Sequence, residues 1–312
     1  MRFSALGTSG VTASVVGLGT WPLGGGTDWG PVDKSSAVRV LHAALAHGIN
    51  LIDTAPIYGD GTSEEQIGQA LGGNRTEVLL CSKCGLVKNG SWTTHDLRPA
   101  SIRTQLEGSL TRLKTDYLDI YLIHYPDPNV PLSEAVGTLA RLQEEGKIRQ
   151  IGLCNVSAEQ IAQAVQVTQI ACVQNEYSLL HRSAGERVFA YCRENGISFM
   201  GYGTLCGGFL SGKYKREPNL RRADARNYFY KTARGDAFTQ AQSAAARVQE
   251  VAAAKGVCAA AVVGAWALQK ADFVLCGAKT PSQVAQNALA EEVTLSAEET
   301  AFLEQDHASE RT

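Results

Sequence analysis

The sequence lacks any apolar run of the roughly 18 to 20 residues that a membrane-spanning helix needs. It also lacks an excess of charge, since 29 Lys and Arg residues balance 31 Asp and Glu residues for a net of -2. No overall field therefore attracts a nucleic acid or an anionic membrane, and we expect neither as a partner. Residues 1–7 reach a glycine before a signal-type apolar stretch forms, which favours the cytoplasm.

Cysteine is too sparse for a disulfide scaffold, because only eight cysteines occur in 312 residues and most lie in apolar runs. We interpret them as reduced, buried thiols. Cys81 and Cys84 have a spacing found in redox and metal motifs. They follow an apolar run that predicts a strand, however, where side chains three positions apart lie on opposite faces. With no second Cys or His pair at ligand spacing, we predict no metal site.

The composition, 44% hydrophobic and 19% charged, is that of a chain with a large core. Short apolar runs rich in β-branched residues alternate with amphipathic stretches, a pattern typical of repeated strand and helix units. The predicted strands are residues 15–20, 51–55, 77–83, 118–124, 148–156, 170–178, 198–205 and 273–278. The predicted helices are residues 35–48, 63–71, 99–114, 132–147, 158–167, 184–195, 239–256 continuing to 270, and 281–290.

Eight such units without a Gly/Pro/Ser-rich linker predict one α/β domain over residues 1–312, built as a (β/α)8 TIM barrel over residues 15–290. Residues 17–19 and 24–26 are glycine-rich but lack the spaced dinucleotide fingerprint, so an open Rossmann sheet has little support. We expect a hairpin over residues 1–14 that closes the barrel bottom, and a long loop over residues 207–237 on the cofactor side. The tail, residues 291–312, is expected to contain a helix over 296–309.

Two capping boxes are predicted, because each pairs a serine with a Glu or Gln three residues later. Ser63 and Gln66 would begin the second helix of the barrel. Ser296 and Glu299 would begin the helix of the tail.

Polar side chains recur at the predicted strand ends, which meet on the catalytic face of such a barrel. These residues are Asp53, Lys83, His124, Asn155, Gln174 and Tyr202. Any one of them alone is as well explained by a structural hydrogen bond. Six on one rim indicate a site.

The chemistry they favour is proton transfer to a carbonyl oxygen. Asp53 and Lys83 would form an ion pair in a low-dielectric setting. Tyr58 lies five residues beyond Asp53, and the Lys83 ammonium is expected to lower the pKa of its phenol, which makes it a general acid near neutral pH. A neutral His124 would donate a hydrogen bond to the substrate oxygen.

None of these residues donates hydride, so the reaction requires an organic cofactor. Tyr202 offers an aromatic face for a nicotinamide, and the amides of Asn155 and Gln174 suit its carboxamide. Two segments could meet the anionic end of the cofactor: the start of the last barrel helix, with Lys279, Thr280, Gln283 and Asn287, and a basic loop with Lys213, Lys215, Arg216, Arg221, Arg222 and Arg226. A merely solvated loop is the alternative for the second segment.

Several segments resemble the aldo-keto reductase family, in order and over nearly the whole chain. They are residues 48–59 (GINLIDTAPIYG), 63–68 (SEEQIG), 118–124 (LDIYLIH), 146–152 (GKIRQIG) and 207–214 (GGFLSGKY), together with the surroundings of Lys83. The resemblance is nearer to the microbial and channel-subunit-like branches than to the mammalian type. It implies a (β/α)8 barrel, a catalytic tetrad of Asp53, Tyr58, Lys83 and His124, and NADPH or NADH extended across the rim.

The expected ligand contacts follow from this resemblance. For the cofactor they are Gly19, Thr20, Trp21, Asp53, Cys154, Asn155, Gln174, Tyr202, Gly203, Thr204, Leu205, Gly207, Gly208, Leu210, Lys213, Gly277, Lys279, Thr280, Gln283, Gln286 and Asn287. For the substrate pocket they are Trp21, Trp29, Tyr58, Trp92, His124 and Tyr125, with Asp28 and Asp127 as further candidates. Cys154 departs from the family, which commonly has serine there. Lys279 and Gln283 also depart from it, where mammalian-type members place other residues.

The leading hypothesis is an NADP(H)-dependent reductase of small aldehydes or ketones, with NAD(H) as a possible cofactor. One alternative is an NAD-dependent dehydrogenase that oxidises a sugar. Another, of a different class, is a catalytically weak nucleotide-sensing interaction protein like the channel-associated relatives. The complete tetrad weighs against this last alternative.

Overall fold

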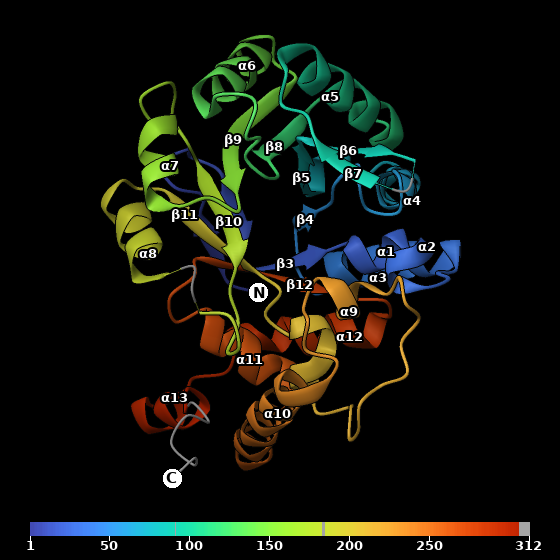
Figure 1. The fold of residues 1–312 in the computed structure, drawn as a ribbon, viewed down its shortest axis with the longest axis vertical. Coiled ribbons are helices and arrows are strands. Elements are labelled where there is room, and N and C mark those ends of the chain that lie inside the picture. The colour runs from blue at the N-terminus through green and yellow to red at the C-terminus, as the bar shows by residue number, and fades with distance from the viewer. Residues whose placement is uncertain (91, 183–184, 306–312) are drawn as a thin grey trace.

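A closed barrel of parallel strands forms the centre of the computed structural model, which describes residues 1–90, 92–182 and 185–305 (Figure 1). The strands follow one another around the barrel in the order β3, β4, β5, β8, β9, β10, β11 and β12. They span β3 (Val16–Gly19), β4 (Leu51–Asp53), β5 (Leu79–Cys84), β8 (Leu118–Ile123), β9 (Ile148–Cys154), β10 (Cys172–Glu176), β11 (Ser198–Tyr202) and β12 (Phe273–Gly277). Each predicted strand is present, which confirms the predicted barrel.

The helices surround the barrel in an outer layer (Figure 1). They are α1 (Trp21–Gly24), α2 (Gly26–Trp29), α3 (Lys34–Ala46), α4 (Thr62–Leu71), α5 (Pro99–Leu113), α6 (Leu132–Glu144), α7 (Ala158–Ala164), α8 (Gly185–Glu194), α9 (Ala225–Tyr228), α10 (Gly235–Lys255), α11 (Ala259–Ala267), α12 (Pro281–Ala288) and α13 (Ala297–Leu303). Short 3-10 helices are η1 (Arg75–Glu77), η2 (Cys206–Ser211) and η3 (Leu289–Glu291). The barrel helices match the predicted ones to within a few residues, and residue 184 of the predicted sixth helix lies outside the described residues.

The predicted continuous helix from residue 239 to 270 is wrong. The chain forms two helices, α10 and α11, with a bend of 102° between them. Gly256 ends α10 with a φ of 67°, in the left-handed region that stops a helix, and Cys258 is extended before α11 begins. Within the described residues, only these two helices taken together have the length and hydrophobicity of a membrane span, and no single helix has them.

The predicted capping box at Ser63 is also wrong. Gly61 precedes α4 without a side-chain cap, and Ser63 lies inside the first turn, fully buried. Its hydroxyl donates to Thr20 Oγ1 at 2.7 Å and lies 3.0 Å from Thr54 Oγ1. The hydroxyl therefore fastens α4 to the loops that follow β3 and β4, which outweighs its use as a cap.

The tail helix was predicted in the right place but too long. Ser296 and Glu299 form the predicted capping box at the start of α13. The helix ends at Leu303, and residues 306–309 of the prediction lie outside the described residues.

The bottom of the barrel is closed by the predicted hairpin, β1 (Phe3–Ala5) paired antiparallel with β2 (Thr12–Ser14). Leu6 at its turn is fully buried in the inner core, the cluster inside the barrel that also includes Cys81. Cys84 belongs instead to the outer core between barrel and helices. The two cysteines thus lie on opposite faces of β5, as predicted.

A second hairpin follows β5 and was not predicted. It consists of β6 (Leu86–Asn89) and β7 (Trp92–His95), paired antiparallel. Because it follows the C-terminal end of a barrel strand, it lies on the face where the polar strand ends meet.

Candidate functional site

Lys83 is the centre of the polar cluster at the C-terminal ends of the strands. Its Nζ lies 2.7 Å from Asp53 Oδ1, 2.9 Å from the Thr54 carbonyl oxygen and 3.3 Å from Tyr58 Oη. An ammonium has three protons and no acceptor, so each proton has one partner. The side chain is fully buried. Burial lowers the pKa of Lys83 and is the largest single effect, but the Asp53 carboxylate and the other neighbouring groups together outweigh it, so the net shift is upward and Lys83 stays charged.

The pKa of Tyr58 moves opposite to the predicted direction. Burial raises it, and this effect exceeds the lowering by the Lys83 ammonium. The phenol therefore carries its proton at neutral pH. Since Lys83 can only donate, Tyr58 Oη accepts the bond between them, and the O–H of Tyr58 is available for another acceptor.

His124 follows β8 and faces Tyr58, with ring centroids 6.0 Å apart in an edge-to-face arrangement. Burial lowers the pKa of His124 well below its ordinary value, and the charges of Lys83 and His95 lower it further. The imidazole is therefore neutral near pH 7, as predicted. A neutral imidazole retains one N–H donor.

Two glycines bring the first loop of the barrel against Tyr58. A Cβ on Gly24 would lie 2.7 Å from the Tyr58 carbonyl carbon, and one on Gly59 would lie 2.0 Å from the Gly24 carbonyl oxygen. Neither position has room for a side chain, so the two backbones pack directly together. This contact holds Tyr58 at its place on the loop between β4 and α4.

The predicted amide residues form a hydrogen-bonded group beside the tetrad. Gln174 Nε2 donates to Asp53 Oδ1 at 2.8 Å, and Cys154 Sγ lies 3.7 Å from Gln174 Oε1. Asn155 Nδ2 donates to the His124 carbonyl oxygen at 2.9 Å, and Asn155 Oδ1 accepts from Tyr202 at 2.6 Å. The structure therefore brings the predicted strand-end residues into one network.

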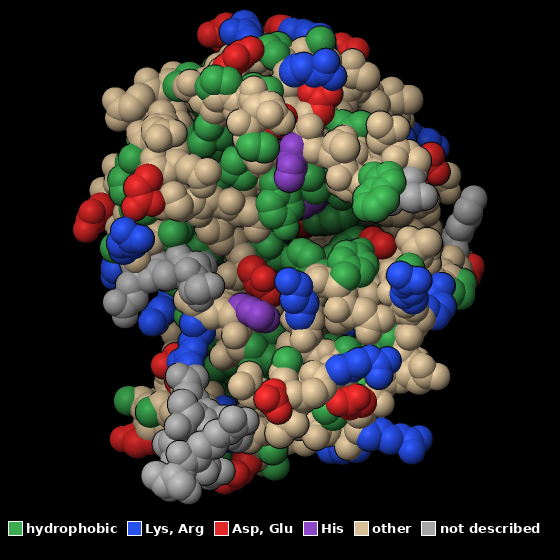
Figure 2. Space-filling view, viewed as in Figure 1, with side chains coloured by type: hydrophobic (Ala, Val, Ile, Leu, Met, Phe, Trp, Pro, Cys, Tyr) green, Lys and Arg blue, Asp and Glu red, His purple; other side chains and the backbone are tan. Residues whose placement is uncertain are grey.

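Aromatic rings surround the tetrad. Trp21 stacks on Tyr58 with centroids 5.8 Å apart, and Tyr125 stacks on His124 at 5.3 Å. Phe229, from the loop after β11, lies edge-on to Trp21 at 5.1 Å. The face of the molecule drawn in Figure 2 is hollowed near its middle, and hydrophobic side chains gather around the hollow. Such a wall suits the apolar body of a small carbonyl compound.

Trp29, predicted in the substrate pocket, lies beside two cations. The Lys279 Nζ is 5.4 Å and the Arg226 guanidinium 5.6 Å from its ring centroid, and Lys279 Nζ donates to the Trp29 carbonyl oxygen at 2.6 Å. Its own indole N–H is buried and has no hydrogen-bond partner among the described residues. Burial lowers the pKa of Lys279, and the charges of Arg226 and Lys213 lower it further. We call Lys213, Arg226 and Lys279 the cation cluster.

The other predicted pocket residues differ in their placement. Trp92 is 78% exposed on the β6–β7 hairpin. Asp28 accepts from Trp21 Nε1 at 3.0 Å. Asp127 accepts from the Leu97 backbone N–H at 3.1 Å, which holds the loop before α5.

Several residues predicted to bind the cofactor are already bonded within the protein. Thr20 Oγ1 donates to the Asp53 carbonyl oxygen at 2.8 Å, and Gln283 Oε1 accepts from the Lys279 backbone N–H at 2.7 Å. The Leu210 side chain is buried in the outer core, and Lys215, exposed, bonds Gln249 at 3.4 Å. Gly207 and Gly208 have positive φ angles in η2, where Gly208 lies beside Lys213 Nζ.

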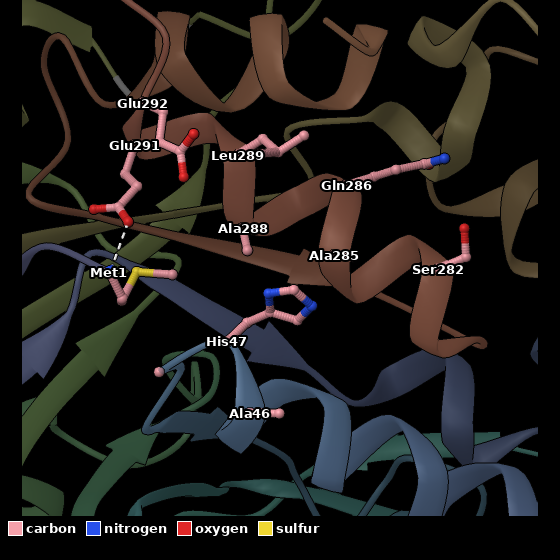
Figure 3. Close-up of a pocket in the computed structure, with 11 residues that line it drawn as sticks. Met1, Ala46, His47, Ser282, Ala285, Gln286, Ala288, Leu289, Glu291 and Glu292 are labelled. Carbon is pink, nitrogen blue, oxygen red and sulfur yellow. Dashed lines mark ion pairs between the residues drawn. The ribbon is translucent and has the colours of Figure 1, made fainter.

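Gln286 lines a separate groove of about 600 Å³ between α3 and α12 (Figure 3). The groove also includes Met1, His47 and Glu291, and the amino group of Met1 pairs with Glu291 at 2.9 Å. No tetrad residue lines it. Neither in this groove nor elsewhere in the described residues could a group of three His, Cys, Asp or Glu side chains hold a metal ion.

Sequence reasoning missed the Thr54 carbonyl, Phe229, Gly24 and Gly59 as parts of the site. A backbone carbonyl leaves no trace in residue type. The run Gly24-Gly25-Gly26 lacks the spacing of a dinucleotide fingerprint, and its residue types alone do not indicate contact with Tyr58. Phe229 lies in the long loop over residues 207–237, where the basic residues form a pattern and the aromatic residues do not.

Comparison with known proteins places this site in context. The profile of the aldo/keto reductase family matches residues 15–306. Aldo-keto reductase YhdN of Bacillus subtilis (strain 168) is 38% identical over 290 residues, which cover 91% of this chain and 87% of that protein. The NADH-specific methylglyoxal reductase of Escherichia coli (strain K12) is 37% identical over 336 residues, with 100% of each chain covered.

Solved structures share the fold. The glycerol dehydrogenase AKR11B4 from Gluconobacter oxydans superposes with a TM-score of 0.85 at 34% identity, over 94% of this chain and 91% of that one. An aldo/keto reductase from Klebsiella pneumoniae, in complex with NADP and acetate, has a TM-score of 0.73 at 28% identity, over 97% and 94% of the two chains.

Proposed function

This chain belongs to the aldo/keto reductase family, and from that premise we propose that Asp53, Tyr58, Lys83 and His124 are its catalytic residues. The protein is an oxidoreductase that acts on C=O and CH–OH groups with a nicotinamide cofactor. The observation that carries the assignment is the Lys83 ammonium, which bonds both Asp53 and Tyr58 while fully buried.

Tyr58 is the general acid of carbonyl reduction. Its oxygen accepts from Lys83, so its own proton is free for the substrate oxygen. As the C=O π bond breaks, that oxygen takes the proton from Tyr58, and the ammonium of Lys83 stabilises the phenolate that forms. Asp53 holds Lys83 in place. Water then returns a proton to Tyr58.

His124 orients the substrate. Because its ring is neutral, it donates one hydrogen bond to the carbonyl oxygen without offering a competing proton. Trp21 and Tyr125 flank the reacting carbonyl and exclude water from it. The aromatic wall favours a small aldehyde or ketone.

The residues present fit a nicotinamide dinucleotide. The buried, unpartnered indole N–H of Trp29 beside the cation cluster suits phosphate oxygens, and the ring of Tyr202 suits a nicotinamide face. When bound, the reduced nicotinamide supplies the hydride that the carbonyl carbon receives. We propose NADP(H) over NAD(H), because Lys213 and Lys279 of the cation cluster can pair with an additional phosphate, whereas Arg226 is already ion-paired with Asp224 at 2.6 Å. The relatives differ on this point, one being NADH-specific and another complexed with NADP.

The reverse reaction is the second candidate, and the likeness to a glycerol dehydrogenase favours it. In that direction Tyr58 would accept the hydroxyl proton of a polyol or sugar. We also propose that the chain acts as one domain in the cytoplasm, where its free cysteines, seven of them buried, stay reduced.

The test is turnover of the purified protein with NADPH and NADH across small aldehydes, ketones and aldoses. Tyr58→Phe should lower kcat by at least about a hundredfold, since it removes the general acid, and should leave the affinity for NADPH within a few-fold of wild type. Phe229→Leu, on the aromatic wall but outside the tetrad, is the comparison for packing effects. Full activity of Tyr58→Phe would refute the mechanism.

A further inference from the structure

Gln174 reaches Asp53 from the opposite side of the barrel. The two residues lie on β10 and β4, which are four strands apart in a closed ring of eight. Gln174 Nε2 and Lys83 Nζ both donate to the same oxygen, Asp53 Oδ1, at 2.8 and 2.7 Å. Gln174 is 2% exposed, so water does not replace this bond.

The chemistry of the partners fixes the orientation of the Gln174 amide. A carboxylate can only accept, so the NH₂ group faces Asp53 and Oε1 faces the thiol of Cys154. Asn155 Nδ2 lies 3.2 Å from Cys154 Sγ, and Asn155 accepts from Tyr202. One chain of hydrogen bonds therefore runs from Tyr202 through Asn155, Cys154, Gln174, Asp53 and Lys83 to Tyr58.

The Gln174 amide retains unused capacity. One N–H and one lone pair of Oε1 have no partner among the bonds just described, and a carboxamide presents the complementary acceptor and donor. A group bound there would bond the same amide that holds Asp53. The Gln174 side chain thus connects the place where a carboxamide would bind to Asp53, and through Lys83 to Tyr58.

We infer that Gln174 is a positioning residue for Tyr58. It holds Asp53 against Lys83, and it links the binding of a carboxamide beside Cys154 and Asn155 to the proton donor, Tyr58. This inference rests on the proposed carbonyl reduction. Without the Gln174 donor, the charge of Asp53 acts undiminished on Lys83 and Tyr58, which strengthens the hold of Tyr58 on its proton. Proton donation then slows although Tyr58 is intact.

The central variant is Gln174→Met, which keeps side-chain length and removes both hydrogen-bonding groups. We expect kcat to fall roughly 10- to 100-fold, the range for a lost bond to a charged group. The KM for the carbonyl substrate should change far less. In the oxidation direction, the rise of rate with pH should move to higher pH, because less tyrosinate forms at a given pH.

Variants of Cys154 provide an independent test of the same chain of hydrogen bonds. Cys154→Ala removes the donor to Gln174 Oε1, whereas Cys154→Ser keeps a donor, so the alanine variant should lose more of kcat than the serine variant. Cys192→Ala removes an equally small side chain, but from α8 in the outer core, and should keep kcat. If Gln174→Met fails to fold, this set carries the test.

A measurement without turnover separates this inference from the proposed function. In cofactor-free protein, the carbon-13 resonance of Tyr58 Cζ, assigned by its loss in Tyr58→Phe, reports the bond to Lys83. Gln174→Met should move it toward its position in Lys83→Met. An unmoved resonance overturns the inference even if no carbonyl is reduced. The inference is also overturned if Gln174→Met weakens only cofactor binding and leaves kcat and the pH profile unchanged. Gln174 would then bind the carboxamide of the cofactor without positioning Tyr58.

Discussion

Lys83 decides which side chains of the site keep their protons. Its three donors are satisfied by Asp53, Thr54 and Tyr58, and the ion pair with Asp53 keeps it charged despite complete burial. Burial also favours the neutral forms of two neighbours: at Tyr58 it outweighs the opposing charge of Lys83, and at His124 the charge of Lys83 adds to it. It holds Tyr58 in its neutral, protonated form and His124 in its neutral, unprotonated form.

The neutral His124 predicts how stability depends on pH. Its pKa in the folded protein lies below that of the unfolded chain, about 6.5, so the folded state binds fewer protons in between. The stability this provides is complete above that pH and is lost as the pH falls below it, by up to about 1.4 kcal/mol per pH unit. Urea unfolding of wild type and His124→Gln between pH 7.5 and 5 measures this.

The wild-type protein should lose more stability on acidification than His124→Gln does, since all other titrating groups are common to both. Parallel curves would show that the pKa of His124 is the same in the folded and unfolded states. Carbonyl reduction at saturating substrate should show no acid-side fall from a titrating His124 between pH 7.5 and 6.

At the scale of elements, two loops meet across the rim and assemble the cation cluster. Arg221 Nη2 lies 3.4 Å from the carbonyl oxygens of Gly26 and Thr27, which joins the loop after β11 to α2. Trp29 of α2 then lies against Arg226 of α9 and Lys279 before α12. Helices α2 and α9 each have four residues, so these contacts, rather than their own hydrogen bonds, must hold them.

Lys279 is expected to bind the additional phosphate of NADP(H). Lys279→Ala should weaken NADPH binding roughly 10- to 100-fold, as for a lost charge-assisted hydrogen bond, and NADH binding by much less. Quenching of tryptophan fluorescence during titration with each cofactor measures both affinities.

Lys215→Ala is the matched control, because Lys215 belongs to the same basic loop but is exposed and bonds Gln249. It should leave both affinities near those of wild type. Equal losses for NADPH and NADH in Lys279→Ala would assign Lys279 to a phosphate that the two cofactors share.

At the scale of the whole molecule, the hairpin that stabilises the barrel and the residues of the tetrad lie at opposite ends of the strands. The hairpin at the bottom places Leu6 in the inner core and bonds the start of β11 through Gly7 N–H and Ser198 Oγ, 2.8 Å apart. A Cβ on Gly7 would lie 2.6 Å from the Ala171 carbonyl oxygen, so only glycine fits. The tetrad lies at the other end of the strands.

Leu6→Ala should therefore lower stability without impairing catalysis. Removing a fully buried leucine costs about 2 to 5 kcal/mol, whereas Phe3→Ala in the same hairpin, at a side chain 49% exposed, should cost within about 0.5 kcal/mol. Urea unfolding gives both values. The kcat of Leu6→Ala below its unfolding transition should equal that of wild type. A loss no larger than that of Phe3→Ala would mean that the hairpin does not seal the core.

The eight strands, the surrounding helices and the meeting of Asp53, Lys83 and His124 at one rim could be predicted from the sequence. Hydrophobic periodicity is local, and parallel strands of one barrel bring their ends to one face. The bend after α10 was missed because its residues are apolar on both sides and only Gly256 marks it. The predicted cap at Ser63 is wrong because its hydroxyl bonds residues of two other loops, Thr20 and Thr54.

What the sequence by itself determined is which chemical groups are present and on which strand ends they lie. The tertiary structure alone decided their electrostatics and their partners. Burial outweighed the Lys83 charge and reversed the predicted shift of the Tyr58 pKa, and the closed ring brought Gln174 to Asp53. Both outcomes depend on desolvation and on contacts between residues distant in sequence, which residue order does not contain.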